Sequence, residues 1–226
     1  MLQLPLNIQL DDSAKFDNFF AEPNRLLVNR LVTMKGEHPQ FIFIWGSEQT
    51  GKTHLAQALC HQADQQALTA AYLPLDNPEL SPAIIEGMSF MDLVCIDNLH
   101  SVIDDEAWQV ALFNLYNELK SEGRSLIILS DQPPADMSIS LADLKSRLTA
   151  MEVYKLEGLS DNDKVELFKT RASNRGIDLS EEVVKFIFSR HSRALPELMT
   201  LLDKIDRSSI ALKRKVTIPL VKGLLD

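Results

Sequence analysis

Short apolar runs alternate with helical stretches along the first part of the chain. The runs lie at residues 41–45, 70–75, 93–96, 126–129 and 153–156. Short, mostly apolar runs of this kind are typical of strands that are buried on both faces. The longest helical pattern between them, 106–122, places Leu112 and Leu115 on one face. The pattern therefore predicts an α/β fold in which helices sandwich a parallel sheet.

The hydrophobic pattern changes near residue 157. No convincing strand follows, and amphipathic segments lie at residues 161–174, 180–190, 194–211 and 218–225. Ser160 and Ser180 are predicted helix N-caps, and Gly176 and Pro219 are natural stop and start signals. We expect an N-terminal segment at 1–15, an α/β domain at 16–157 and a small all-helical domain at 158–226.

An apolar stretch containing a proline opens the chain: Leu2-Gln3-Leu4-Pro5-Leu6. Pro5 lacks an N–H group and restricts Leu4 to extended geometry, so the stretch cannot be a helix interior. Such a segment suits docking into a groove of a partner. The alternative is that it folds back onto its own chain.

Residues 46–53 read Gly-Ser-Glu-Gln-Thr-Gly-Lys-Thr and match the phosphate-loop pattern G-x-x-x-x-G-K-[ST]. The match follows the first predicted strand and precedes a helical stretch, as this motif requires. Its glycines let backbone N–H groups wrap around a phosphate. Lys52 adds a positive charge for the outer phosphates, and the Thr53 hydroxyl is placed to bind magnesium. The sequence therefore predicts a nucleotide site.

Asp97 ends the third predicted strand and is the candidate for a second acid that holds magnesium through its waters. Phosphate-loop ATPases that hydrolyse quickly usually carry Asp or Glu next, whereas this chain has Asn98. An amide can hydrogen-bond a water but cannot accept its proton. We expect tight nucleotide binding with slow turnover.

Three further charged residues are candidates at this stage. Asp131 follows the fourth predicted strand, at the sheet edge where ligands bind, and is suited to sensing the γ-phosphate or positioning water. The alternative is a turn residue ahead of Pro133. Arg147 precedes the last strand and Arg193 lies between helical segments, and by default each is a surface charge.

The composition narrows the classes of partner. The 226 residues carry a net charge of −9, which opposes the positive surface that dominates DNA affinity. We therefore expect no strong direct DNA binding. No apolar run reaches the ~18 residues of a membrane span. Cys60 and Cys95 lack metal-ligand spacing and suit a reducing compartment, so we expect a cytoplasmic protein.

The motifs together form a recognisable series: Phe16-Asp17-Asn18-Phe19 with Glu22, the phosphate loop, Ile96-Asp97-Asn98, Ser130-Asp131, Ser146-Arg147-Leu148 and Ser192-Arg193-Ala194-Leu195. In order and spacing the series resembles AAA+ proteins of the DnaA initiator clade over residues 16–226. Within that clade it resembles the regulatory, Hda-like branch most closely. Three features support this: Asn98, the opening apolar segment, and an end after the helical domain without a basic helix-turn-helix.

The resemblance implies that the site binds ADP or ATP with magnesium. The nucleotide-binding candidates are Phe16, Asp17, Gly46, Ser47, Gln49, Thr50, Gly51, Lys52, Thr53, His54, Asp97 and Arg193. Thr53 and Asp97 would hold magnesium. By resemblance Asp131 is sensor 1, Arg193 is sensor 2 from the lid, and Arg147 is an arginine finger. The catalytic candidates are thus Arg147, Asn98 and Asp131.

In Hda-like proteins the finger acts in trans on ATP bound to DnaA, and an N-terminal peptide binds the sliding clamp, the beta subunit of DNA polymerase III. The implied function is therefore a regulator that prevents re-initiation of replication. The resemblance also allows the chain to form a homo-oligomer. The clamp candidates are Leu2, Gln3, Leu4, Pro5 and Leu6. The family's clamp motif begins with Gln one position earlier, where this chain has Met1.

Three rival functions remain open from the residues. An autonomous AAA+ ATPase that remodels or loads a partner would need a better water-activating residue than Asn98. A small-molecule kinase would need an arginine-rich lid, whereas the C-terminal pattern suits a packed helical core. A DNA-binding initiator conflicts with the acidic balance.

Overall fold

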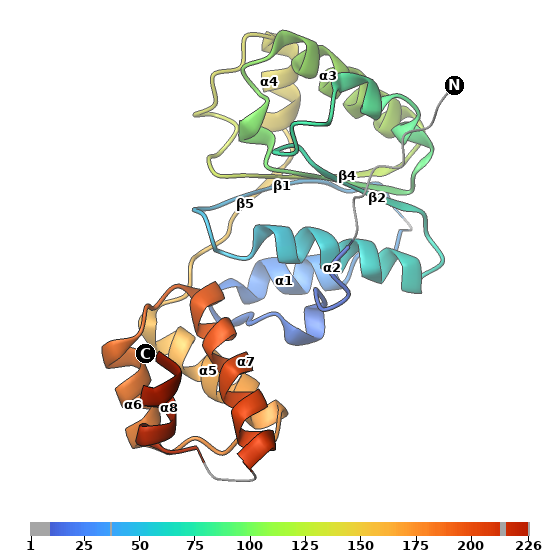
Figure 1. Ribbon diagram of the computed structural model, residues 1–226. Coiled ribbons are helices and arrows are strands. Elements are labelled where there is room, and N and C mark those ends of the chain that lie inside the picture. The colour runs from blue at the N-terminus through green and yellow to red at the C-terminus, as the bar shows by residue number, and fades with distance from the viewer. Residues whose placement is uncertain (1–9, 37, 213–215, 226) are drawn as a thin grey trace. The chain divides into compact units, whose positions relative to one another are not determined.

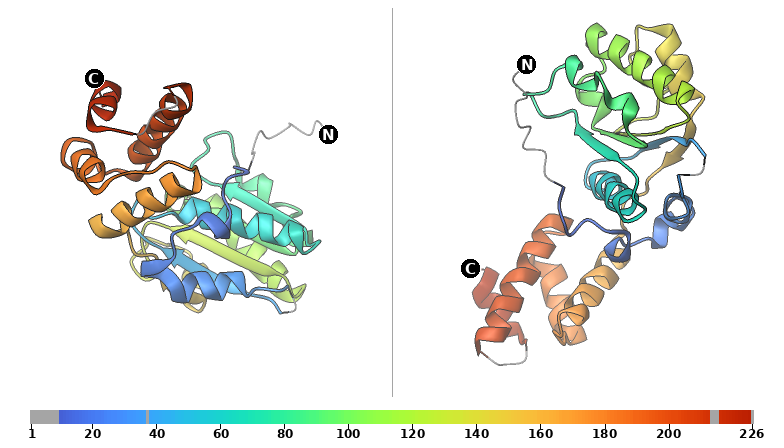
Figure 2. Two further views of the ribbon diagram at one scale, coloured as in Figure 1. Left: turned by 90° about the horizontal axis from the view of Figure 1, so that it is seen from below. Right: turned by 90° about the vertical axis from the view of Figure 1, so that its right-hand side faces the viewer.

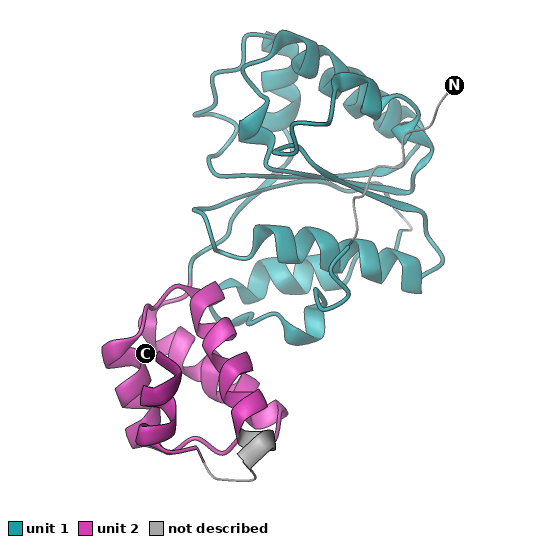
Figure 3. Ribbon diagram, in the orientation of Figure 1, with its two compact units in different colours: residues 1–158 teal, residues 159–226 magenta. Residues whose placement is uncertain are grey.

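The computed structural model describes residues 10–36, 38–212 and 216–225 (Figure 1). The chain divides into two compact units, residues 1–158 and 159–226 (Figure 3). The apolar opening segment, residues 2–6, lies outside the described residues. Within the described part, no helix has both the length and the apolar character needed to cross a membrane.

Five parallel strands form the sheet of the first unit. Their order is β2-β3-β4-β1-β5, and every neighbouring pair is parallel. The strands are β1 (Phe41–Trp45), β2 (Ala70–Pro74), β3 (Leu93–Asp97), β4 (Ser125–Ser130) and β5 (Glu152–Lys155). All five expected strands are confirmed, with ends within one residue of those predicted.

Helices cover both faces of this sheet. Figure 1 shows α1 (Arg25–Val32) and α2 (Lys52–Gln65) on one face and α3 (Glu106–Ser121) and α4 (Ala142–Thr149) on the other, and Figure 2 shows the same layers from two more sides. Successive strand residues point to opposite faces. In β1, Ile42 packs in the core beneath α1 and α2, while Phe43 packs beneath α3 and α4. Burial on both faces explains the continuous apolar runs of β1, β3 and β4.

The hydrophobic pattern does not reveal every helix. Helices α1 and α4 were not predicted; each has eight residues and no side-chain cap that would mark its start. Five short 3-10 helices were also not predicted: η1 (Phe16–Asn18), η2 (Glu22–Asn24), η3 (Pro82–Ile85), η4 (Met88–Phe90) and η5 (Leu99–Ser101).

The second unit contains helices and connecting loops, with no strand among its described residues. Its helices are α5 (Asp161–Asn174), α6 (Glu181–Arg190), α7 (Leu195–Leu212) and α8 (Ile218–Leu225), and they share one apolar core. The predicted caps are confirmed: the Ser160 side chain accepts from the N–H of Asp163, and the Ser180 side chain from that of Val183. Gly176 follows α5 with φ 73°, a left-handed conformation that glycine adopts without strain.

Candidate functional site

The loop between β1 and α2 has the backbone of a phosphate cradle. Gln49 and Gly51 are left-handed, with φ of 61° and 99°, and Gly51 is the N-cap of α2. Gly46 donates its N–H to the Ser130 carbonyl at 3.2 Å. A Cβ atom on Gly46 would lie 2.5 Å from the Leu156 carbonyl oxygen, so only glycine fits there. This turn directs the free N–H groups at the start of α2 toward an anion.

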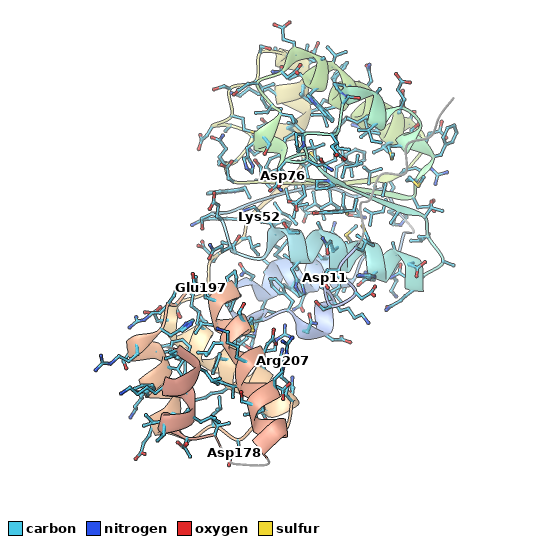
Figure 4. All side chains as sticks on the ribbon, in the orientation of Figure 1. Asp11, Lys52, Asp76, Asp178, Glu197 and Arg207 are labelled. Carbon is cyan, nitrogen blue, oxygen red and sulfur yellow. The ribbon has the colours of Figure 1, made fainter. Side chains whose placement is uncertain are left out.

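Lys52 occupies the centre of this cradle, at the start of α2 (labelled in Figure 4). Its side chain is buried, and Nζ donates to the carbonyl oxygens of Gly46 at 2.6 Å and Ser47 at 2.8 Å. Burial lowers the pKa of Lys52, and nearby carboxylates, Asp97 foremost, oppose that shift. Thr50 also donates to the Ser47 carbonyl, at 2.9 Å. A buried ammonium held by loop carbonyls fits a phosphate-binding role, because phosphate oxygens are stronger acceptors.

Asp97 is the polar centre of the sheet edge beside α2. It is fully buried at the end of β3, and its Oδ2 accepts from Thr53 Oγ1 at 2.6 Å and from the Tyr72 hydroxyl at 3.0 Å. Its Oδ1 accepts from the N–H of Asn98 at 3.0 Å. The fold thus brings together the hydroxyl and the carboxylate that a magnesium site needs. The donor set fits that ion, since hard cations prefer oxygen ligands.

Tyr72 is a site residue that the sequence did not indicate. It lies in β2, opposite Cys95 of β3 in the sheet register, so its hydroxyl reaches the end of the neighbouring strand. Burial, assisted by the charge of Asp97, raises the pKa of Tyr72, which keeps the hydroxyl protonated as a donor. The only sequence signal is one hydroxyl in an otherwise apolar strand.

Asn98 and Asp131 lie at the ends of neighbouring strands β3 and β4. Asn98 is left-handed, with φ 57°, a conformation that asparagine tolerates better than most residues. The Asp131 carboxylate is exposed, and its Oδ1 lies 3.5 Å from Nδ1 of His100 in η5. Sequence reasoning missed His100, because this contact depends on the loop conformation after Asp97.

The segment before α1 borders the phosphate loop. In η1, Phe16 packs partly buried against the core beneath α1 and α2, while Asp17 is exposed. The Phe19 ring lies 5.4 Å from the His54 ring, between centroids. His54 Nε2 hydrogen-bonds the Lys15 carbonyl at 2.9 Å. His54 therefore fastens this segment to the start of α2.

Arg193 belongs to the helical unit and interacts within it. Its guanidinium donates to the carboxylate of Asp161, and its Nε donates to the Phe188 carbonyl at 3.3 Å. Its side chain is exposed. The expected contact between Arg193 and a nucleotide stays a prediction.

Arg147 lies away from the phosphate loop. It occupies the last turn of α4, is exposed, and places its guanidinium carbon 5.9 Å from the centroid of the Tyr116 ring. The Tyr116 ring packs in turn on Phe41, the first residue of β1, at 4.7 Å between centroids. Gly46 follows the opposite end of β1. At ~3.3 Å per residue, a strand of this length separates the two ends by roughly 15 Å. Arg147 therefore lies at the edge of the sheet where the strands begin, and the phosphate loop lies at the opposite edge, where the strands end.

Two family models match the chain. The bacterial DnaA ATPase domain matches residues 10–153, and the lid domain of Hda matches residues 161–225. The first match covers more than half of the chain.

Solved structures show the same fold at low sequence identity. Domain III of the replication initiation protein DnaA from Thermotoga maritima has a TM-score of 0.76 and 23% identity, covering 96% of this chain and 97% of that one. AMPPCP-bound DnaA from Aquifex aeolicus has a TM-score of 0.74 and 23% identity, covering 87% and 66%. A variant of RuvB from Thermotoga maritima has a TM-score of 0.69 and 15% identity, covering 93% and 70%.

These matches agree with the geometry. The phosphate loop follows β1 of a five-stranded parallel sheet, and the buried Asp97 ends β3 at the same edge of that sheet. The helices α5 to α8 follow. The chain belongs to the bacterial DnaA ATPase family, as an Hda-like protein with an AAA+ fold and a C-terminal helical lid domain.

Proposed function

We propose that this chain regulates replication initiation by presenting Arg147 in trans to ATP bound by DnaA, which stimulates its hydrolysis and prevents re-initiation. The position of Arg147 carries the proposal. It is exposed and lies at the opposite edge of the sheet from the phosphate loop of its own chain. A guanidinium in that place has no route to its own nucleotide but is accessible to the nucleotide of a neighbouring molecule.

The expected rate effect of such a contact is large. Charge develops on the oxygens of the phosphoryl group as it is transferred, and a planar guanidinium stabilises that charge with two N–H donors. An arginine finger typically accelerates hydrolysis by ~10³- to 10⁵-fold. The ring of Tyr116 supports the Arg147 side chain without occupying its N–H groups with a carboxylate.

The chain's own nucleotide has a different role in this proposal. Lys52 would hold the phosphates of ADP or ATP, and Thr53 with Asp97 would hold magnesium, as their 2.6 Å contact supports. Asn98 cannot accept a proton from an attacking water, so the nucleotide persists. A retained nucleotide, with Arg193 contacting it from the lid, then serves as part of the structure. AMPPCP in the DnaA of Aquifex aeolicus supports a nucleotide in this fold.

The remaining parts of the proposal concern location and partners. Residues 2–6 would bind the sliding clamp, so that the chain meets DnaA on replicated DNA in the cytoplasm. The apolar side chains of Leu4 and Leu6 on either side of Pro5 support a groove-binding peptide.

The decisive experiment measures hydrolysis of DnaA-bound ATP in the presence of clamp-loaded DNA. Arg147→Ala should lose nearly all stimulation while retaining its own ADP affinity, because only the finger is removed. Lys120→Ala is the matched control: its Nζ lies 5.9 Å from the same Tyr116 ring, so it should stimulate normally. Full stimulation by Arg147→Ala would reject the finger role.

An autonomous ATPase that remodels or loads a partner is the second candidate. The contact between Thr53 and Asp97 favours it, because both magnesium candidates belong to this chain. Steady-state ATP turnover by the purified chain alone distinguishes the two functions. A rate near 1 s⁻¹ or above, typical of enzymes, would support the alternative. A much slower rate supports the regulator.

A further inference from the structure

Gln109 is a buried amide in the middle of α3. Its side chain is 1% exposed and lies beside the apolar core between α3 and the sheet. Nε2 donates to the Ile103 carbonyl at 2.7 Å. Oε1 accepts from the N–H of Leu141 at 2.8 Å and from the Ser140 hydroxyl at 3.0 Å. A buried polar side chain with three hydrogen bonds to two separate loops fixes those loops in place.

The two loops that Gln109 joins belong to the two halves of the proposed mechanism. Ile103 lies in the loop that leaves β3 after Asp97 and Asn98. Leu141 is the N-cap residue of α4, the helix that carries Arg147. The amide thus links the loop of the magnesium candidate to the start of the finger helix. The 3.5 Å contact between His100 and Asp131 joins the same two connections a second time.

Helix α4 is packed against the core along its length, so its N-terminal and C-terminal residues move together. Leu144 and Leu148 are buried in the core with Met137, and Lys145 Nζ donates to the Met137 carbonyl at 3.1 Å. An eight-residue helix is ~12 Å long and stiff over that length. A change at its N-cap therefore moves Arg147 as part of a rigid body.

We propose that Gln109 is a positioning residue, which sets the orientation of α4 and transmits the state of the loop after Asp97 to Arg147. This inference rests on the proposed function of Arg147. It adds that the chain's own nucleotide controls how the finger is presented. The bonds of Gln109 supply the physical link, since a nucleotide that moves the loop through Asn98 also moves Ile103.

The test compares Gln109→Met with wild type. Methionine keeps the length of the side chain but makes none of the three hydrogen bonds. Three quantities are measured: stimulation of DnaA-bound ATP hydrolysis, the chain's own ADP affinity, and hydrogen exchange of the amides of residues 142–149. We expect stimulation to fall roughly 10- to 100-fold, as displacement of a reacting group by about 1 Å does. ADP affinity should change less than about twofold, because Lys52, Thr53 and Asp97 are untouched.

Hydrogen exchange gives the readout that a merely structural role would not move. In wild type, the α4 amides should exchange at different rates with and without ADP. In Gln109→Met that dependence on ADP should disappear. Asn117→Leu is the matched control, because this half-buried amide on α3 donates to the Phe113 carbonyl of its own helix rather than to a loop. Ser140→Ala, which removes one bond, should give an intermediate effect and replaces Gln109→Met if that variant does not fold.

The possible failures are distinguishable. If Arg147→Ala abolishes stimulation and Gln109→Met, or Ser140→Ala in its place, retains it, this inference is wrong and the proposed function stands. If Arg147→Ala has no effect, the proposed function is wrong. In that case an ADP dependence of α4 exchange that requires Gln109 still supports the link. An α4 exchange rate independent of ADP in wild type overturns it.

Discussion

Asn98 meets two requirements: it adopts a left-handed backbone conformation, and its side chain cannot accept a proton from water. Its φ of 57° places it in the left-handed region, and its N–H bonds to the Asp97 carboxylate. Asparagine and aspartate both accept this conformation more readily than longer side chains. Only the amide, however, lacks a site that can take a proton from water. Slow ATP turnover is therefore compatible with the presence of both magnesium candidates, Thr53 and Asp97.

Exchange of this amide for a carboxylate tests the point. Asn98→Asp should keep the backbone conformation and raise the intrinsic ATPase rate of the purified chain. General-base assistance is typically worth ~10²- to 10⁴-fold, and we expect an increase of at least about 10-fold. Asn98→Gly, which keeps the conformation without any side chain, is the control and should show no increase. Equal rates for all three proteins would contradict this account of slow turnover.

Some residues of the site can be predicted from the sequence and others cannot. Lys52 and Thr53 follow from one contiguous motif, and Asp97 from its place at the end of an apolar run. Tyr72, His100 and Gln109 are different, because each acts through a partner on another strand, loop or helix. Their contacts depend on strand order and loop conformation, which local patterns do not contain.

At the scale of elements, the phosphate loop is shaped by a second segment far along the chain. Gly46 lies against the Leu156 carbonyl just after β5, and Gly158 lies beside Thr50. Asn24 fastens the same stretch, donating to the Glu157 carbonyl at 2.9 Å and accepting from its N–H at 2.8 Å. The shape of the cradle therefore depends on three segments: the phosphate loop, residues 156–158 and the segment at Asn24.

Gly46→Ala should disrupt this arrangement. The added Cβ would lie 2.5 Å from a backbone oxygen, which cannot move without shifting β5. We expect a loss of about 1–3 kcal/mol in the free energy of unfolding, typical of overpacking, together with weaker ADP binding. Thermal unfolding and ADP titration measure the two effects. Gly158→Ala is the control, because its Cβ would make an ordinary 3.6 Å contact with Thr50. If the two variants behave alike, the close approach at Gly46 does not matter.

Elements with a continuous apolar run or a recognisable cap were the predictable ones. The interiors of strands β1, β3 and β4 are apolar because both faces are covered, and α5 and α6 carry serine caps that local chemistry specifies. Helices α1 and α4 have eight residues each and no side-chain cap, whereas α8, which is equally short, is marked in the sequence by Pro219. The helix that carries Arg147 is thus among those that needed the structure.

At the scale of the whole molecule, a double substitution in the opening segment tests the proposed clamp contact. Leu4→Ala together with Leu6→Ala should weaken binding to the sliding clamp by roughly 10-fold or more, because two apolar anchors are lost. ADP affinity should not change. Leu26→Ala is the control, since Leu26 is 78% exposed on α1 and also loses apolar surface. Clamp affinity that is unaffected by the double substitution would remove residues 2–6 from the proposal.

The placement of Arg147 and the phosphate loop at opposite edges of the sheet gives the molecule a direction. A two-fold axis pairs one surface patch with its own copy, so it could bring an arginine to the partner's cradle only if a single patch held both groups. Because the two groups lie at opposite edges of the sheet, we expect a pairing that delivers the guanidinium to a triphosphate to run head to tail. Such a pairing leaves one unmatched arginine at one end and one unmatched cradle at the other, and each end is free to accept a different member of the same family.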